Sequence, residues 1–147
     1  MNEMYFLNVS GTGFDVEVLR QAEKYKQRYK GLGVYLRGVR DAIRHFRPLE
    51  ARIAFDDAEL TPQKFTIISI GNGRYIGGGM CCVPTAQVND GLFDVVVTRP
   101  VPRWLIAVLM TIYVPGWYAK TPFVVHRRCK RLRIVCPGMT VNLDGEL

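Results

Sequence analysis

Apolar residues recur at helical spacing in three stretches of the chain. The first stretch begins at Asp15, a candidate N-cap, and ends at Gly31. The second ends before Pro48, and its apolar stripe consists of Leu32, Leu36, Val39, Ile43 and Phe46. The third covers residues 102–114. These spacings predict three helices, two of them grouped near the beginning of the chain.

Other segments show the period of a β-strand. Ala51, Ile53 and Phe55 alternate with the positions between them, and Asp56 follows as a turn, which predicts a hairpin. Further strands are predicted at residues 4–9, 65–70, 93–97, 130–135 and 140–144. Because strands and helices do not alternate along the chain, the pattern predicts an α+β fold, an antiparallel β-sandwich with N-terminal helices.

The composition limits the class of protein. A chain of 147 residues has the size of one domain, and with 48% hydrophobic and 22% charged residues it has enough apolar surface to form a core. The longest apolar run, from Trp104 to Val114, is far below the roughly 20 residues needed to cross a bilayer. We therefore expect one folded domain that does not span a membrane.

Cysteine and histidine spacing argues against a zinc site. The four cysteines contain no Cys-x-x-Cys pair, and the two histidines show no metal-ligand spacing. The sequence does not open with a signal peptide, so a cytoplasmic location with reduced cysteines is expected.

The net charge of +7 favours an anionic partner without choosing among nucleic acid, nucleotide phosphate and acidic lipid. The basic run at residues 126–133 matches neither a heptad basic region nor a zinc finger, and it is equally typical of a solvated face. A largely apolar stretch bracketed by Arg99, Arg103 and Lys120 carries four aromatic residues, as in helices that lie in a lipid headgroup layer; they are Trp104, Tyr113, Trp117 and Tyr118. A core helix whose aromatic residues pack in the sandwich is the alternative.

Two glycine pairs fail as nucleotide-binding loops. Gly11-Thr12-Gly13 and Gly71-Asn72-Gly73 have Val16 and Ile76 where the dinucleotide motif requires a third glycine, and neither ends as a P-loop does. They fit tight turns. The triplet Gly77-Gly78-Gly79 follows a predicted strand and indicates that a ligand or another backbone approaches closely.

Two acidic segments could carry chemistry. One short loop holds four oxygen donors that could bind a hard cation or form an ordinary Asp-Gly turn, namely Gln87, Asn89, Asp90 and Asp94. Asp144 and Glu146 lie two residues apart after an alternating strand, so both can point to one face of the sheet. Such a pair suits general-base catalysis or magnesium positioning, although surface Asp-Gly-Glu turns are common.

Taken in order along the chain, four groups of residues carry a family resemblance. They are Asn8 with Gly11, Gly13, Phe14 and Asp15; Gly71-Asn72 with Gly77-Gly78-Gly79-Met80; Pro84 and Ala86 with Asn89-Asp90-Gly91; and Asp144-Gly145-Glu146. This set resembles the bacterial diacylglycerol kinase and YegS-like lipid kinase family, which includes the catalytic domains of sphingosine and ceramide kinases. The resemblance covers nearly the whole chain.

The resemblance implies that residues 1–147 form the C-terminal domain of a lipid kinase, with the sandwich fold of the NAD kinase and diacylglycerol kinase-like superfamily. In that family the base that deprotonates the lipid hydroxyl maps onto Glu146, with Asp144 beside it supporting magnesium or the reacting groups. The structural magnesium of bacterial members maps onto Gln87, Asp90 and the carbonyl of Leu92. Gln87 is an amide where some relatives carry aspartate, which weakens this metal site.

One part of the family pattern is missing. The Gly-Gly-Asp-Gly-Thr nucleotide motif does not occur, so ATP and Mg²⁺ are expected to bind mainly to an N-terminal nucleotide-binding domain outside this chain. Without that domain the chain should not phosphorylate lipid, because phosphoryl transfer depends on positioning and neutralising the γ-phosphate.

The expected function is therefore the C-terminal part of an ATP-dependent kinase that phosphorylates a diacylglycerol-like or sphingoid lipid. The alternative is a non-catalytic lipid-binding or partner-binding module from a truncated gene product. The expected partners are the lipid substrate, an anionic membrane surface in peripheral association, and the nucleotide-binding domain, while a homodimer stays open. Nucleic acid, which only the charge suggests, is not expected.

Overall fold

The structure is a computed structural model that describes residues 4–77 and 79–147, except for the side chain of Leu32. Its helices are α1 (Phe14–Glu23), α2 (Leu32–His45), α3 (Arg103–Tyr113) and the 3-10 helix η1 (Trp117–Lys120). Its strands are β1 (Val9–Gly13), β2 (Leu49–Phe55), β3 (Thr61–Phe65), β4 (Ile67–Gly71), β5 (Tyr75–Ile76), β6 (Met80–Cys81), β7 (Phe93–Thr98), β8 (Val124–Cys129), β9 (Leu132–Val135) and β10 (Val141–Leu143).

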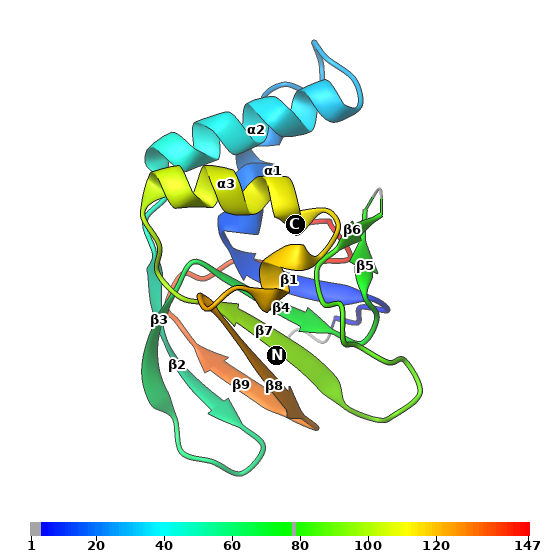
Figure 1. Cartoon of the computed structure of the whole chain (residues 1–147), viewed down its shortest axis with the longest axis vertical. Helices are drawn as coiled ribbons and strands as arrows, with labels where there is room; N and C mark the ends of the chain where they lie inside the picture. Colours follow the sequence, from blue (N-terminus) through cyan, green and yellow to red (C-terminus); the bar gives the residue numbers. More distant parts are fainter. Residues whose placement is uncertain (1–3, 78) are drawn as a thin grey trace.

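These elements form three layers (Figure 1). A five-stranded sheet of order β10-β1-β4-β7-β8 lies in the middle, with the helices on one face and a three-stranded sheet of order β3-β2-β9 on the other. All strand pairs between the described residues of these two sheets are antiparallel. The predicted α+β class with an antiparallel sandwich is therefore confirmed.

The middle sheet has a hydrophobic core on each face because successive side chains of a strand point to opposite sides. On β4, Ile67 packs under the helices, whereas Ile68 packs between the two sheets. On β7, Val96 belongs to the core under the helices, and Val95 and Val97 belong to the core between the sheets. This burial on both faces explains why both strands are continuous apolar runs in the sequence.

A corner at Thr66 joins the two sheets. The predicted single strand over residues 65–70 is wrong, because Thr66 separates β3 from β4, which belong to different sheets. The Thr66 amide donates to the carbonyl of Thr98 (2.8 Å), its carbonyl accepts from the amide of Phe14 (2.9 Å), and its hydroxyl donates to the carbonyl of Arg99 (3.1 Å). The corner residue is thus buried with all its polar groups paired.

The predicted buried strand over residues 4–9 is also wrong. Tyr5 is 87% exposed, and the strand begins only at Val9 and runs through the glycines that predicted a turn. These glycines are needed for packing, because a side chain on Gly11 would overlap the Asp15 carboxylate. Asp15 itself is not the N-cap of α1; Gly13 takes that position, and Asp15 lies in the first turn.

The helices differ from prediction in length and in the face that they bury. The first helix ends at Glu23 instead of near residue 31, and the segment after it forms turns. Leu36, expected on the buried stripe of α2, is 56% exposed. The close contact with α1 is made at Gly38, where an added Cβ would lie 2.9 Å from the Cβ of Ala22. Helix α3 and strands β2 and β7 lie where they were predicted.

Candidate functional site

A cavity of about 120 Å³ lies between the helices and the middle sheet. Its walls are largely apolar and include Val9, Val18, Leu19, Ile76 and Met80. Gly77 also lines it. A Cβ on Gly77 would meet only the Met80 side chain, at an ordinary 3.6 Å, and one on Gly79 would meet no described atom within 4 Å, so another backbone does not approach these two glycines closely. Approach of a ligand to the glycine triplet stays a prediction, and Gly78 lies outside the described residues. The lining residues come from α1, α2, α3 and several strands, so the cavity exists only in the folded domain.

The polar groups of the cavity come mainly from Asp15 and Asn142. The side-chain amide of Asn142 donates a hydrogen bond to Oδ2 of Asp15. Oδ1 of Asp15 and Oδ1 of Asn142 are shielded from solvent and have no hydrogen-bond partner among the described residues. Burial raises the pKa of the Asp15 carboxyl to about 6, against the opposing effects of a backbone hydrogen bond at Val16 and of the Asn142 amide.

The remaining polar groups of the cavity are neutral. Cys82 and Tyr113 line it from the segment after β6 and from α3. Burial raises the pKa of the Cys82 thiol to about 12 and that of the Tyr113 hydroxyl well above its ordinary value. Neither group therefore supplies a nucleophile or a charge at neutral pH.

The Asp144-Gly145-Glu146 segment forms a tight hairpin turn at one side of this cavity. Leu143 and Glu146 exchange two backbone hydrogen bonds of 2.9 and 3.0 Å, which leaves Asp144 and Gly145 as the two loop residues. Both have positive φ, 53° and 96°, the geometry in which Asp-Gly is the favoured pair. Gly145 lines the cavity, and Glu146 follows it directly with an exposed side chain.

Asp144 fastens this turn to the N-terminal segment. Its Oδ2 accepts a hydrogen bond from the amide of Leu7 (2.7 Å), and its Oδ1 accepts from the amides of Asn8 and Val9 (both 2.9 Å). Desolvation raises the pKa of the Asp144 carboxyl, but the three amide donors outweigh it and hold the pKa below its ordinary value. Both oxygens of Asp144 are thus occupied by backbone donors, while Glu146 stays exposed.

The predicted metal loop has its carboxylates occupied by protein groups. Asp90 accepts a hydrogen bond from the amide of Leu92 (3.0 Å) and pairs with the guanidinium of Arg128. Gln87 is exposed. No cluster of three or more histidine, cysteine, aspartate or glutamate side chains suited to a metal ion occurs in residues 4–77 and 79–147. The two oxygens of Asp90, the one carboxylate of the predicted metal site, are therefore already engaged by protein donors.

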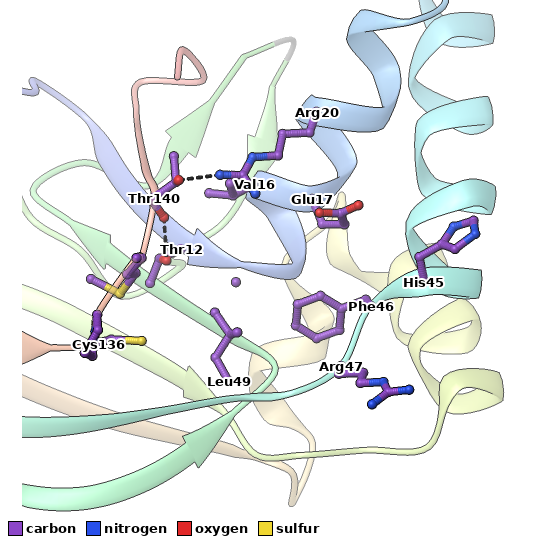
Figure 2. A pocket seen from close by; sticks show the side chains of 14 residues that line it. Thr12, Val16, Glu17, Arg20, His45, Phe46, Arg47, Leu49, Cys136 and Thr140 are labelled. Carbon is purple, nitrogen blue, oxygen red and sulfur yellow. Dashed lines mark hydrogen bonds between the residues drawn. The ribbon is translucent and has the colours of Figure 1, made fainter.

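A larger hollow of about 360 Å³ lies between α1, the end of α2 and residues 136–140. Figure 2 shows that its charged side chains do not converge: Arg20 turns toward Thr140, whereas His45 and Arg47 extend to the α2 side, away from Cys136. Two hydrogen bonds cross this hollow: the guanidinium of Arg20 donates to the hydroxyl of Thr140, and the hydroxyl of Thr12 donates to the carbonyl of Thr140 (2.7 Å). Both are contacts within the fold. We assign no chemistry to this hollow.

The aromatic residues of α3 and η1 divide between core and surface. Tyr113 and Tyr118 are buried, with ring centroids 4.5 Å apart. Trp104 and Trp117 are 69% and 63% exposed, and Val108 lies one helical turn from Trp104 on the same exposed face. The core interpretation therefore holds for Tyr113 and Tyr118, whereas contact of the exposed indoles with a lipid headgroup layer stays a prediction. No helix in the described part of the chain is long and apolar enough to cross a bilayer.

The sequence did not predict two of the residues described above, Asn142 of the cavity and Arg128 of the loop around Asp90. Asn142 was not singled out, although its strand buries asparagine and exposes Val141, the reverse of the usual order, and that inversion was a usable signal. Arg128 was read as part of a basic run; it belongs to β8, a strand that the charges concealed. Asp15 was named only as a cap candidate and as part of the family pattern.

Comparisons with known proteins find lipid kinases and one of their domain families. The family model described as the YegS C-terminal NAD kinase beta sandwich-like domain matches residues 8–147. A "Diacylglycerol kinase" of Mycobacterium tuberculosis is 29% identical over 98% of this chain and 46% of its own length. A "Probable lipid kinase YegS-like" of Pseudomonas aeruginosa is 31% identical over 99% of this chain and 48% of its own length. The chain thus spans about half the length of these relatives.

Solved structures show the same fold. The crystal structure of a diacylglycerol kinase from Bacillus anthracis strain Sterne matches with a TM-score of 0.57 and 16% identity, over 99% of this chain and 44% of that chain. A second crystal structure from the same strain matches with a TM-score of 0.64 and 21% identity, over 97% of this chain and 47% of that chain. Both matches fall on a part of a longer protein.

Proposed function

Because the chain belongs to the YegS C-terminal NAD kinase beta sandwich-like domain family, we propose that it supplies the lipid pocket and the catalytic base of a lipid kinase. The observation that carries the proposal is the apolar cavity that reaches Gly145, one residue before the exposed carboxylate of Glu146. The names of the relatives favour a diacylglycerol-like lipid as the substrate, and a sphingoid lipid offers the same kind of hydroxyl.

In the proposed reaction, Glu146 accepts the proton of the lipid hydroxyl as that oxygen forms its bond to the γ-phosphorus of ATP. The bond between the γ-phosphorus and the ADP oxygen breaks, and the products are a phosphorylated lipid and ADP. ATP supplies the phosphoryl group, and bound magnesium would neutralise the charge of its phosphates. Both are expected to be held mainly by the nucleotide-binding domain outside this chain. Asp144 is a positioning residue here, because its hydrogen bonds to residues 7–9 fix the turn that carries Glu146.

The cavity suits the hydroxyl end of a lipid. The unpaired oxygens of Asp15 and Asn142 offer acceptors for a hydroxyl group, and the remaining wall is apolar. Pockets that enclose a drug-sized ligand have volumes of roughly 300–1,000 Å³, so a cavity of about 120 Å³ holds only part of a lipid. We expect it to receive the polar end and the first carbons, with the rest of the chains leaving toward the helices.

The proposal extends to an anionic membrane surface as the source of the substrate. Trp104 and Val108 of α3 and Trp117 of η1 are exposed apolar side chains, and the cations Arg103 and Lys120, close by along the chain, are exposed as well. An indole at such a place binds well between headgroups and acyl chains, and each nearby cation adds attraction to anionic lipid. Helix α3 lies beside α2 on the outside of the helical layer, where a flat surface could reach it (Figure 1).

The test joins the chain to the nucleotide-binding half of its M. tuberculosis relative and measures transfer of phosphate from ATP to diacylglycerol and sphingosine. We expect Glu146→Gln to reduce transfer at least a thousandfold while thermal unfolding is unchanged. Glu59→Gln, which alters an exposed glutamate near the β2–β3 turn, is the matched control. Normal transfer by Glu146→Gln would refute the assignment of the base, and vesicle binding without any transfer by the joined wild-type protein would favour a non-catalytic module.

A further inference from the structure

Strands β7 and β8 place one acidic residue directly opposite one basic residue. In the antiparallel register, Asp94 of β7 faces Arg128 of β8. Nε of Arg128 donates to Oδ2 of Asp94 at 3.3 Å, and Asp94 is only 3% exposed. A directly opposed pair of opposite charges stabilises a sheet, and the effect grows where one partner is buried.

The same guanidinium reaches into the loop that precedes β7. Nη2 of Arg128 donates to Oδ2 of Asp90. The fork of one arginine therefore joins two carboxylates, one at the start of β7 and one in the loop. The half-exposed Arg128 side chain closes the loop on its solvent side.

The other carboxylate oxygens of the loop are occupied as well. Oδ1 of Asp90 accepts the amide of Leu92 (3.0 Å), and Oδ1 of Asp94 accepts the hydroxyl of Thr85 (2.7 Å). All four oxygens thus have protein donors. A magnesium ion requires close to octahedral oxygen coordination, so at Asp90 it would have to compete with Arg128 and with the Leu92 amide for the carboxylate oxygens.

We infer that the Arg128 guanidinium does in this chain what a divalent cation at Gln87, Asp90 and Leu92 would do: it neutralises the loop carboxylates and fixes the loop to β8. The loop keeps its conformation without added metal. A cation brought to Asp90 would stand within a few ångströms of a fixed positive charge, and that repulsion opposes binding.

If Arg128 takes the place of a cation, one substitution that removes its charge should make the stability of the chain depend on added metal. Without the guanidinium, neither the Asp90 carboxylate nor the buried Asp94 carboxylate keeps its charged partner, and the exposed amide of Gln87 can add a third oxygen. This donor set, carboxylates and an amide, is the type that Ca²⁺ and Mg²⁺ prefer.

The experiment measures thermal unfolding of the 147-residue chain in EDTA, in 5 mM MgCl₂ and in 5 mM CaCl₂. For the wild-type chain we expect midpoints that agree within about 1 °C in all three solutions. Arg128→Met keeps the aliphatic stem but removes the charge; we expect its midpoint in EDTA to fall by about 5 °C and to recover in part with either cation.

Arg127→Met is the matched control, because Arg127 is the neighbouring residue on the opposite face of the same strand. We expect it to change little and to show no response to cations. A rise of several degrees for the wild-type chain in MgCl₂ would overturn the inference, and so would an Arg128→Met variant that responds to cations no more than Arg127→Met. If Arg128→Met does not fold, Arg128→Gln, which also removes the charge but keeps a hydrogen-bond donor, gives the same comparison, and the wild-type arm stays decisive. None of these readouts depends on kinase activity.

Discussion

The side-chain amide of Asn142 donates a hydrogen bond to the carboxylate of Asp15, 127 residues earlier in the chain. The pair links β10 to the first turn of α1 and forms the polar side of an otherwise apolar cavity. Each partner keeps one oxygen without a hydrogen bond, which a purely structural pair would be expected to satisfy. In the proposed function these two oxygens accept a hydrogen bond from the lipid hydroxyl, and burying them unpaired has a cost in stability.

That cost predicts a pH dependence of stability. The pKa of Asp15 is about 6 in the folded chain, above its ordinary value of 3.8, so the folded chain binds this proton more tightly than the unfolded chain. The stabilisation is complete below 3.8 and is lost as the pH rises through about 6, a loss of about 3 kcal/mol at 1.36 kcal/mol per pKa unit.

Asp15→Asn removes this titration. In urea unfolding between pH 4 and 8, we expect the free energy of unfolding of the variant to gain on that of the wild-type chain by about 3 kcal/mol across the range, with the change centred near pH 5. Asp57→Asn, at an exposed residue, controls for general effects of charge. A difference between Asp15→Asn and wild type that does not vary with pH would contradict the assigned cause.

The turn before Glu146 should depend on Asp144 for its position. Asp144→Ala removes the acceptor of three backbone amides and places a β-carbon at a φ of 53° without a polar side chain, so we expect a loss of about 2 kcal/mol in the free energy of unfolding. Asp144→Asn keeps one acceptor oxygen and tolerates the same φ, and its loss should be smaller. Because the pKa of Asp144 is lowered, its contribution is present above pH 3.8 and disappears only as the pH falls through the folded value. Equal losses of unfolding free energy for Asp144→Ala and Asp144→Asn would show that the hydrogen bonds from the backbone amides do not stabilise the fold.

The exposed indoles should decide vesicle binding. In co-sedimentation with vesicles of phosphatidylcholine and phosphatidylserine, we expect Trp104→Ala combined with Trp117→Ala to weaken binding at least tenfold, because two apolar side chains of this size each contribute more than 1 kcal/mol when buried. The thermal midpoint should not change, since both side chains lie on the surface. Tyr5→Ala, another exposed aromatic residue outside α3, serves as the control. Unchanged binding by the double variant would exclude this face as the membrane contact.

Local patterns predicted the elements whose residues face one environment along their length. The alternation around Ile53 predicted β2, and the apolar run before Val114 predicted α3. The corner at Thr66 left no local signal, because a run that is buried on both sides reads as one strand whether or not it changes sheet. The strand predicted over residues 4–9 failed for the opposite reason, since Tyr5 and Leu7 favour strands but are exposed, and of residues 5–7 only Phe6 packs on the sheet, at Phe93.

The candidate site was predictable only where it forms a contiguous motif. Asp144-Gly145-Glu146 could be read directly, and the fold adds the cavity beside it. The Asn142 to Asp15 bond and the contacts of Arg128 join segments far apart in the chain, and no spacing rule brings them together. The role of Glu146 as base and the metal role of Gln87, Asp90 and Leu92 stay predictions.

The corner at Thr66 has a consequence for how the molecule opens. Its three hydrogen bonds tie together the start of α1, the end of β7 and the junction of the two sheets, so neither hydrophobic core can separate from the other without breaking all of them. The domain should therefore unfold as one cooperative unit, and the amide of Thr66 should exchange with solvent deuterium only through global unfolding, with a protection free energy equal to the free energy of unfolding.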